Sequence, residues 1–433
     1  MAVAAQAVPF VSQGNGTTYT FTDLAAIESC GVKINGNTFT VDSSFTISAG
    51  DVLKINNNEV IMLGDKVQIS IDAAAFCPAD TATITATEAA QGTAKGFKVL
   101  GGKGVVALKN LRVEYVGFTM GFEGGHFEAD NCTFTLHNTK SASGGVLNFS
   151  KSEKGMKVTN CTFVDNKSSG VASGSNTPVD ILISKCEFRG NTTENRNRPQ
   201  INMTCGNGYG VTVEDCVVIG GHYTLVGGIA VSNLLGMSIE NTKVVIKNNI
   251  VRENRYGINI TGSAHAEIIG NTIVDNIYET NPQNGGSAIS VYDAAGKGTC
   301  KIRDNYMENN LWGITIPSGA PAVDAGNEDE PGNNVFKNNG NGDPFKRYEF
   351  FNNGTATAYA IGNDWNSENP EDLINGDVIW RVETGIADVD AAQVASVRYF
   401  NINGVEAAQP FDGVNIVVTR FNDGTTTATK VIK

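Results

Sequence analysis

The sequence predicts an all-β protein in which a long solenoid of stacked coils is followed by a small C-terminal β-domain. Two observations lead to this class. First, the segment "NCTF" at residues 131–134 recurs as "NCTF" at 160–163 and as "KCEF" at 185–188, and weaker copies follow. Second, the 433 residues include 49 Gly but only 11 Pro, with apolar runs rich in Val, Ile, Thr and Phe. This composition is typical of strands and turns, and a repeat of about 20–50 residues indicates stacked structural units.

Each repeat has a central residue that recurs at intervals of 25 to 34 residues. The predicted centres are Cys132, Cys161, Cys186, Cys216, Thr242, Asn271, Asn305 and Asn334. Apolar residues stand two positions after each centre and three positions before it, for example Val158 and Phe163 around Cys161. This odd spacing breaks the alternation of a single strand, so we expect two short strands joined by a tight bend. The residue before the centre is mostly Asn, Asp or Gly, which tolerate a left-handed backbone.

A third strand completes each coil. Its signature is a small residue followed by alternating apolar residues, as in "GVLNF" at 145, "GIAV" at 228, "GINI" at 257, "SAISV" at 287 and "GITI" at 313. The earlier strands "FTVDSSFTISAGDVLKI" and "VIMLGDKVQISI" are expected to form irregular first coils. They would cap the N-terminal end, because an open coil exposes strand edges and apolar core.

Parallel coils place like residues above one another at about 4.8 Å, so two internal ladders are predicted. One is formed by Cys132, Cys161, Cys186 and Cys216, and the other by Asn166, Asn191, Asn276, Asn310 and Asn339, each five residues after a centre. None of the eight cysteines forms a C-x-x-C pair. We interpret them as buried free thiols, with disulfides between adjacent coils and a zinc site as the alternatives.

These units, of the form I-x-N-C-x-F-x-x-N, resemble the right-handed parallel β-helices of the pectate-lyase-like superfamily over roughly residues 20–365. The resemblance implies outward carboxylates on the third strand if the protein cleaves polyuronides, either to hold calcium or as an acid and base pair. The corresponding positions read Leu147, Ala230, Asn259, Ser290 and Thr315, with Ala172 and Asn202. None is acidic, so the sequence favours glycan binding over catalysis.

Three loops that lead into the third strand carry the candidate binding residues. They read "RGNTTENRNRPQ" from 189, "KNNIVRENRYG" from 247 and "DNIYETNPQNGG" from 275. Arg recognises carboxylates and sulfates, and Tyr stacks on sugar rings. The predicted glycan-binding groove consists of Arg189, Arg196, Arg198, Asn202, Arg252, Arg255, Tyr256, Asn259 and Tyr278.

Two alternatives accompany this prediction. An acidic-polysaccharide lyase would use a loop arginine as its base, with Arg196, Arg198 and Arg255 as the candidates. Calcium would be its one cofactor, with Asp165, Glu187 and Glu194 as candidate ligands. A structural spacer or adhesin would need no groove at all.

The net charge of −13 argues against nucleic acid or an anionic membrane as the main partner. No apolar run reaches about 18 residues, so no membrane insertion is predicted. We expect a monomer whose acidic run "GNEDEPGN" is solvated surface. The small residues in "MAVAAQA" resemble a cleavage region, so residues 1–19 are interpreted as a leader remnant.

The C-terminal region departs from the repeat. Residues 366–396 are predicted to be a linker, and residues 397–433 a small β-domain with "NG", "FDG" and "NDG" turns. Tyr399, Gly404, Gly413 and the final Lys430, Val431 and Ile432 resemble the C-terminal sorting tails of secreted Gram-negative bacterial proteins. The resemblance implies a location outside the cell or on the outer surface of a Gram-negative bacterium.

Overall fold

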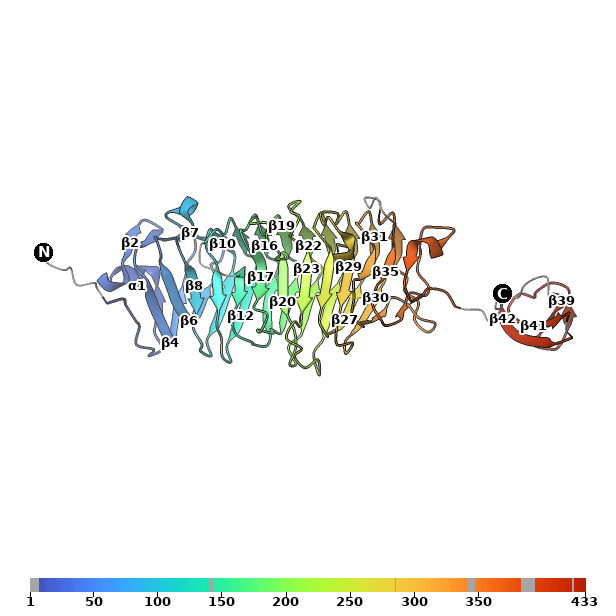
Figure 1. The fold of residues 1–433 in the computed structure, drawn as a ribbon. Helices are drawn as coiled ribbons and strands as arrows, with labels where there is room; N and C mark the ends of the chain where they lie inside the picture. Colours follow the sequence, from blue (N-terminus) through green and yellow to red (C-terminus); the bar gives the residue numbers. More distant parts are fainter. Residues whose placement is uncertain (1–7, 140–143, 285, 341–346, 383–393, 423) are drawn as a thin grey trace. The chain divides into compact units, whose positions relative to one another are not determined.

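The computed structural model describes residues 8–139, 144–284, 286–340, 347–382, 394–422 and 424–433. It divides into two compact units, one up to Trp380 and one from Arg381 onward. The first unit is a stack of parallel strands and the second is a separate antiparallel sheet (Figure 1). The predicted class, an all-β right-handed parallel β-helix followed by a small C-terminal β-domain, is confirmed.

Each coil of the β-helix contains three strands, and each strand pairs in parallel with its counterpart in the next coil. The first strands are β9 (Val105–Lys109), β12 (His126–Asp130), β15 (Met156–Thr159), β18 (Ile181–Ser184), β21 (Val211–Glu214), β24 (Val244–Lys247), β27 (His265–Ile269), β30 (Thr299–Arg303), β33 (Ala322–Asp324), β36 (Ala358–Tyr359) and β38 (Val378–Ile379). The second strands are β3 (Thr38–Val41), β5 (Val60–Leu63), β7 (Ala82–Ala86), β10 (Leu111–Glu114), β13 (Thr133–Thr135), β16 (Thr162–Val164), β19 (Glu187–Arg189), β22 (Val217–Ile219), β25 (Ile250–Arg252), β28 (Thr272–Val274), β31 (Tyr306–Glu308) and β34 (Val335–Lys337).

The third strands contain the predicted small-residue signatures. They are β8 (Gly96–Val99), β11 (Phe118–Met120), β14 (Gly145–Phe149), β17 (Ser169–Ser173), β20 (Ile201–Thr204), β23 (Ile229–Ser232), β26 (Ile258–Thr261), β29 (Ile289–Tyr292), β32 (Ile314–Ile316), β35 (Phe350–Asn352) and β37 (Ile374–Asn375). Two long strands near the N-terminus, β4 (Phe45–Lys54) and β6 (Gln68–Phe76), span the positions of a third and a first strand, since β6 pairs with both β8 and β9.

The bend between first and second strands is a single residue with a left-handed backbone, for example Asn131 at φ 51° and Asn160 at φ 52°. The residue after it points inward and stacks. Cys161 N donates to Cys186 Sγ at 3.4 Å, and Cys186 N donates to Cys216 Sγ at 3.4 Å. All eight cysteines are free thiols. The predicted cysteine ladder is therefore confirmed, and its thiols act as small buried side chains.

The predicted centre Thr242 is wrong, because the true centre of that coil is Asn249. Val211 pairs with Val244, which places Val244 in a first strand, and Cys216 N donates to Asn249 Oδ1 at 2.9 Å. An irregular turn after β23 lengthens this coil and carries the segment "IENTKV", which imitates the repeat motif. The first ladder thus continues from thiols into the amides of Asn249, Asn271, Asn305, Asn334 and Asn363.

The predicted asparagine ladder lies at the other end of the second strand and is confirmed. Its members are joined by hydrogen bonds in the order His137, Asn166, Asn191, Gln200, Asn254, Asn276, Asn310, Asn339 and Glu349. In the coil of Cys216 the ladder position is Gly221, which has no side chain. The side-chain amide of Gln200 takes its place between Asn191 and Asn254. The backbone N–H of His137 therefore begins this buried chain of amides, and the side-chain carboxylate of Glu349 ends it.

Residues at both ends extend the β-helix beyond the predicted boundaries. Gly14 N and Thr17 N each donate to an Asp51 carboxylate oxygen at 2.8 Å, so this part of the predicted leader remnant contacts the N-terminal cap. Residues 1–7 lie outside the described part of the chain. The cap also contains β1 (Thr18–Thr20), α1 (Phe21–Ala25) and β2 (Val32–Asn35).

At the other end, β37 and β38 pair with β35 and β36, so the coils continue past residue 365 into the predicted linker. The short segments η1 (Glu28–Cys30), η2 (Ala89–Gln91), η3 (Pro282–Asn284) and η4 (Pro370–Leu373) are single 3₁₀ turns. None of the helices in the described residues has the length and apolar character needed to cross a bilayer.

The C-terminal unit is an antiparallel sheet of β40 (Glu406–Ala407), β39 (Val394–Asn401), β41 (Val414–Phe421) and β42 (Thr426–Ile432), in that order. Gly404, Gly413 and Gly424 occupy its turns with positive φ of 77°, 94° and 85°. These are the three turns predicted from "NG", "FDG" and "NDG", and glycine is favoured there because other residues rarely adopt this backbone. The resemblance to a sorting tail stays a prediction.

Candidate functional site

The outward row of the third strands, called the third-strand row below, contains no carboxylate. Its register runs Asn148, Ala172, Asn202, Ala230, Asn259, Ser290 and Thr315. The predicted member Leu147 is wrong, because Leu147 is fully buried and pairs with the inward Val171. The signature "GVLNF" has one more residue before its outward position than "GIAV" has. With Asn148 rather than Leu147 at the outward position, all seven residues of the row are still uncharged.

The predicted loops lie together beside this row. Leu225 N donates to Asn195 Oδ1 at 2.9 Å, and Arg255 Nη1 donates to Asn197 Oδ1 at 2.9 Å. We call residues 192–199, 220–226, 253–256 and 276–281 the loop wall. The segment 220–226 was not predicted from the sequence, because its residues carry no charge pattern and only its contacts with neighbouring coils reveal it.

Arg255 is part of the framework of the loop wall. Its Nε and Nη2 both lie 2.5 Å from Glu279 Oε2, and the two side chains are only 15% and 7% exposed. Glu279 also accepts from Thr280 N and Asn281 N. This ion pair fixes the guanidinium within the loop wall, and the roles of Arg255 in glycan binding and as a base stay predictions.

Tyr256, a predicted stacking residue, is buried beside Arg255. It is 9% exposed, and burial raises the pKa of its hydroxyl to about 12. Its ring lies across Gly227, where an added Cβ would be 2.0 Å from a ring atom. Glycine at 227 therefore allows the close approach that buries the ring, and little of the ring remains for a sugar.

The exposed part of the loop wall carries cations and one aromatic pair. Arg196 is 66% exposed and its Nε lies 3.0 Å from Glu194 Oε2. His222 stacks on Tyr278 with ring centroids 4.8 Å apart and an interplanar angle of 13°. His222 Nε2 also lies 3.0 Å from Glu253 Oε2. The His222 side chain is 58% exposed and Tyr278 is half-buried, and the sequence identified only the Tyr278 half of this pair.

The other predicted binding residues divide between two faces. Asn202 and Asn259 are half-buried in the third-strand row, and Arg198 is half-buried at the end of its loop. Arg189 and Arg252 instead lie on the second-strand face, where they form one outward row through Ile219. They pair with Glu187 and Glu253 respectively. The structure therefore does not bring all nine predicted residues into one groove.

The calcium candidates do not form a metal site. Glu194 faces Lys167 Nζ at 3.0 Å as well as Arg196, and Glu187 faces Arg189. Asp165 is exposed at a left-handed position with φ 52°. Among the residues that the structure describes, no group of three or more His, Cys, Asp and Glu side chains is arranged to hold a metal ion. These carboxylates were predicted as ligands because they come from neighbouring coils. In the structure Glu187 and Glu194 are instead ion-paired with Arg and Lys side chains.

A cavity of about 430 Å³ lies next to this cluster and is lined in part by Tyr115, His137, Asp165, Lys167 and Glu194. His137 is 2% exposed, and its Nδ1 lies 3.1 Å from Ser168 Oγ. Burial and the charge of Lys167 lower its pKa to about 4. Its position five residues after Cys132, the ladder position, was the signal that could have revealed it.

Comparisons with known proteins support the fold. A family described as a protein of unknown function (DUF1565) matches residues 184–372. Two solved structures of mutants of the periplasmic alginate epimerase AlgG share 10% identity, with TM-scores of 0.53 and 0.52, and cover 84% of this chain and 83% of theirs.

A double mutant of the tailspike protein of E. coli bacteriophage HK620, in complex with a pentasaccharide, covers 87% of this chain and 77% of its own, at 12% identity and a TM-score of 0.36. No curated protein matches this sequence. The predicted resemblance to right-handed parallel β-helices is thus confirmed for the scaffold.

Proposed function

We propose that this protein binds a polysaccharide through the exposed side of the loop wall and does not cleave it. The observation that carries the proposal is the joining of loops from successive coils into one surface, which exposes Arg196 and the stacked pair of His222 and Tyr278. Loops gathered on one face of a solenoid are frequent binding sites. Aromatic faces and guanidinium groups suit sugar rings and their acidic substituents.

The absence of carboxylates in the third-strand row supports binding over hydrolysis, because paired acids about 5 to 10 Å apart are needed for glycoside hydrolysis. The likeness in fold to an alginate epimerase is in keeping with a polysaccharide ligand. We further propose that the protein acts outside the cell or on the outer surface of a Gram-negative bacterium. The support is the match of Tyr399, Gly404 and Gly413 to sorting tails.

Replacing Arg196 or Tyr278 with alanine should weaken polysaccharide binding about tenfold each, which corresponds to about 1.4 kcal/mol. Each substitution removes an exposed group of the loop wall and leaves the coil core intact. Isothermal titration calorimetry with pectin, alginate and glycosaminoglycan fragments measures the effect. Arg112→Ala is the matched control, because Arg112 is also an exposed, ion-paired arginine but lies on β10, away from the loop wall.

Two results would replace this proposal. An increase in ultraviolet absorbance from unsaturated uronide product, abolished by Arg196→Ala or Arg198→Ala, would establish a lyase. This assay is run with and without calcium. If no acidic or neutral polysaccharide bound in calorimetry or gave an increase in absorbance, a structural spacer or adhesin would be favoured instead.

A further inference from the structure

One bend of the β-helix carries an insertion. Lys301 and Asn305 are four residues apart, and so are Tyr359 and Asn363. Asp324 and Asn334 occupy the same positions in the coil between them but are ten residues apart, so six residues are inserted. At the other first bends from Asn110 to Gly362, a single left-handed residue suffices. An interruption of so regular a bend indicates a local role.

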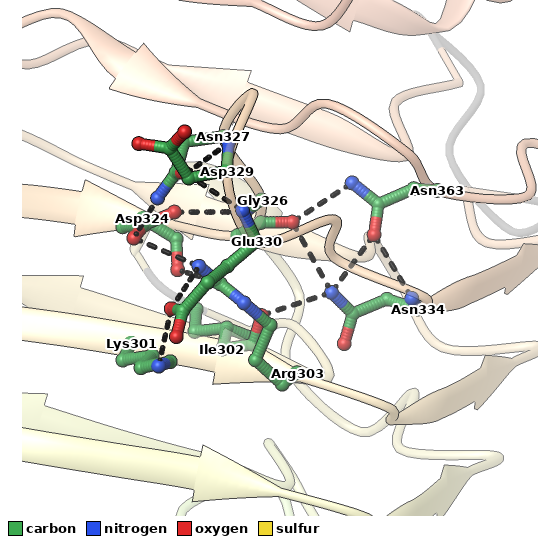
Figure 2. A network of polar contacts seen from close by, with 11 residues as sticks. Lys301, Ile302, Arg303, Asp324, Gly326, Asn327, Asp329, Glu330, Asn334 and Asn363 are labelled. Atoms are coloured by element: carbon green, nitrogen blue, oxygen red, sulfur yellow. Dashed lines mark hydrogen bonds and ion pairs between the residues drawn. The ribbon is translucent and has the colours of Figure 1, made fainter.

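The insertion is held in one conformation by Asn327 (Figure 2). Asn327 Oδ1 accepts from Asp329 N and Glu330 N at 3.0 Å each, and Asn327 N donates to Glu330 O at 2.9 Å. Asn327 Nδ2 donates to Asp324 Oδ2 at 2.9 Å, which ties the turn to the end of β33. The six inserted residues therefore form a fixed turn rather than a loose excursion.

Ion pairs hold this turn to β30. Arg303, whose side chain is 6% exposed, donates from Nη2 to Asp324 Oδ2 at 2.8 Å and from Nη1 to Asp324 O at 2.6 Å. Lys301 Nζ lies 2.5 Å from Glu330 Oε2. The acidic run was expected to be solvated surface, and its Glu328, Asp329 and Glu330 are all exposed. Glu330 is ion-paired with Lys301, and Asp324, which precedes the run, is ion-paired with Arg303.

A cavity of about 510 Å³ opens beside this network on the first-strand face. Its polar lining is Thr299, Lys301, Asp324, Asn327, Thr357 and Tyr359. Tyr359 pairs with Asp324 across the strands, so their backbones lie about one strand spacing, or ~4.8 Å, apart, and Tyr359 is 41% exposed. The exposed Ala322 adds an apolar side chain to the lining, and the core residues Cys300 and Val323 complete it.

We infer that this cavity binds a neutral pyranose residue of a glycan. The apolar face of a sugar ring packs on an aromatic ring such as that of Tyr359. Beyond the bonds that hold the turn, the second hydrogen of Asn327 Nδ2 and the remaining lone pair of Asp324 Oδ1 supply an adjacent donor and acceptor for neighbouring sugar hydroxyls. Both groups are fixed by the turn before any ligand arrives, which lowers the entropic cost of binding.

The charges around the cavity decide the class of sugar. Lys301 and Arg303 are each matched by a carboxylate, and the exposed Glu328 and Asp329 add negative charge in the same turn, directly after the lining residue Asn327. A uronate or sulfate would meet like charge there, which disfavours it. This site takes a different ligand class from that of the loop wall and lies on a different face, so it does not depend on the proposed function.

Titration calorimetry on the full chain tests the inference, with hexasaccharides of glucose, mannose and galactose and with oligogalacturonate. At least one neutral probe should bind saturably, and Tyr359→Ala should weaken that binding at least tenfold. Tyr359→Phe, which keeps the ring, should stay within about threefold of the parent protein. Methyl glycosides of the same sugars show whether a single residue suffices or a chain is needed.

Ile379→Ala is the matched control, because Ile379 follows Tyr359 in the same outward row but does not line the cavity. Neither it nor Arg196→Ala should alter neutral-sugar binding. The inference is overturned if no neutral probe binds, if Tyr359→Ala binds as the parent does, or if oligogalacturonate competes at this site. Circular dichroism confirms that each variant is folded.

Discussion

Replacing Asn310 with alanine should lower the free energy of unfolding by about 4 kcal/mol, the largest effect that we expect of a single substitution in the coils. Asn310 is buried and joins three coils. Its Oδ1 accepts from Asn276 N at 3.1 Å, and its Nδ2 donates to Ile273 O at 2.8 Å and Asn339 Oδ1 at 2.8 Å. Alanine leaves these buried partners unsatisfied, and each costs about 1–3 kcal/mol.

Urea unfolding measures the loss, and amide hydrogen exchange locates it. Exchange should accelerate first in the coils of Asn276 and Asn339, because each coil of a solenoid is stabilised by its neighbours. Thr272→Ala on the outward side of β28 serves as the control and should cost less than about 1 kcal/mol. A loss below 1 kcal/mol for Asn310→Ala would mean that water or relaxation replaces the ladder.

Replacing Glu349 with glutamine should make the protein more stable at pH 8 by about 3 kcal/mol and change little at pH 4. Glu349 is fully buried at the end of the ladder and accepts from Asn339 N and Nδ2 at 3.2 and 2.6 Å. Burial raises its pKa to about 7, against the bonds from Asn339 and the charge of Arg347. Each unit of pKa shift corresponds to about 1.4 kcal/mol.

The sign follows from proton uptake. Between about pH 4.5 and 7 the folded protein keeps a proton on Glu349 that the unfolded chain has released, so stability falls as pH rises through this window. Above pH 7 the loss of stability caused by the buried charge of Glu349 stays at its full value. Glutamine carries no charge, and Gln200 already accepts both donors of Asn191 elsewhere in the ladder.

Thermal unfolding of both proteins from pH 4 to 8 provides the measurement. Comparison at equal pH removes the opposite contribution of His137, whose lowered pKa makes stability rise with pH between about 4 and 6.5. Parallel curves for the parent and Glu349→Gln would show that Glu349 ionises normally in the folded protein.

The candidate site was only partly predictable. The loops of Arg196 and Tyr278 were found because their charged and aromatic residues interrupt the repeat. His222, by contrast, became visible only through its contact with Tyr278, which is 56 residues later in the chain. Arg255 was chosen for its charge, but its pairing with Glu279 depends on how two loops of unequal length meet. Such contacts leave no periodic signal.

The sequence by itself determined the coil, its three strands and the two ladders. The physical reason is that parallel stacking places the same position of every coil in the same environment, so Cys161, Cys186 and Cys216 repeat along the chain as they do in space. Only the tertiary structure decided where the repeat is interrupted. Insertions shift the register of the coils without changing the local sequence pattern. For this reason Thr242 matched the pattern of a repeat centre although the centre is Asn249, and the pairing of Tyr359 with Asp324 was not predicted.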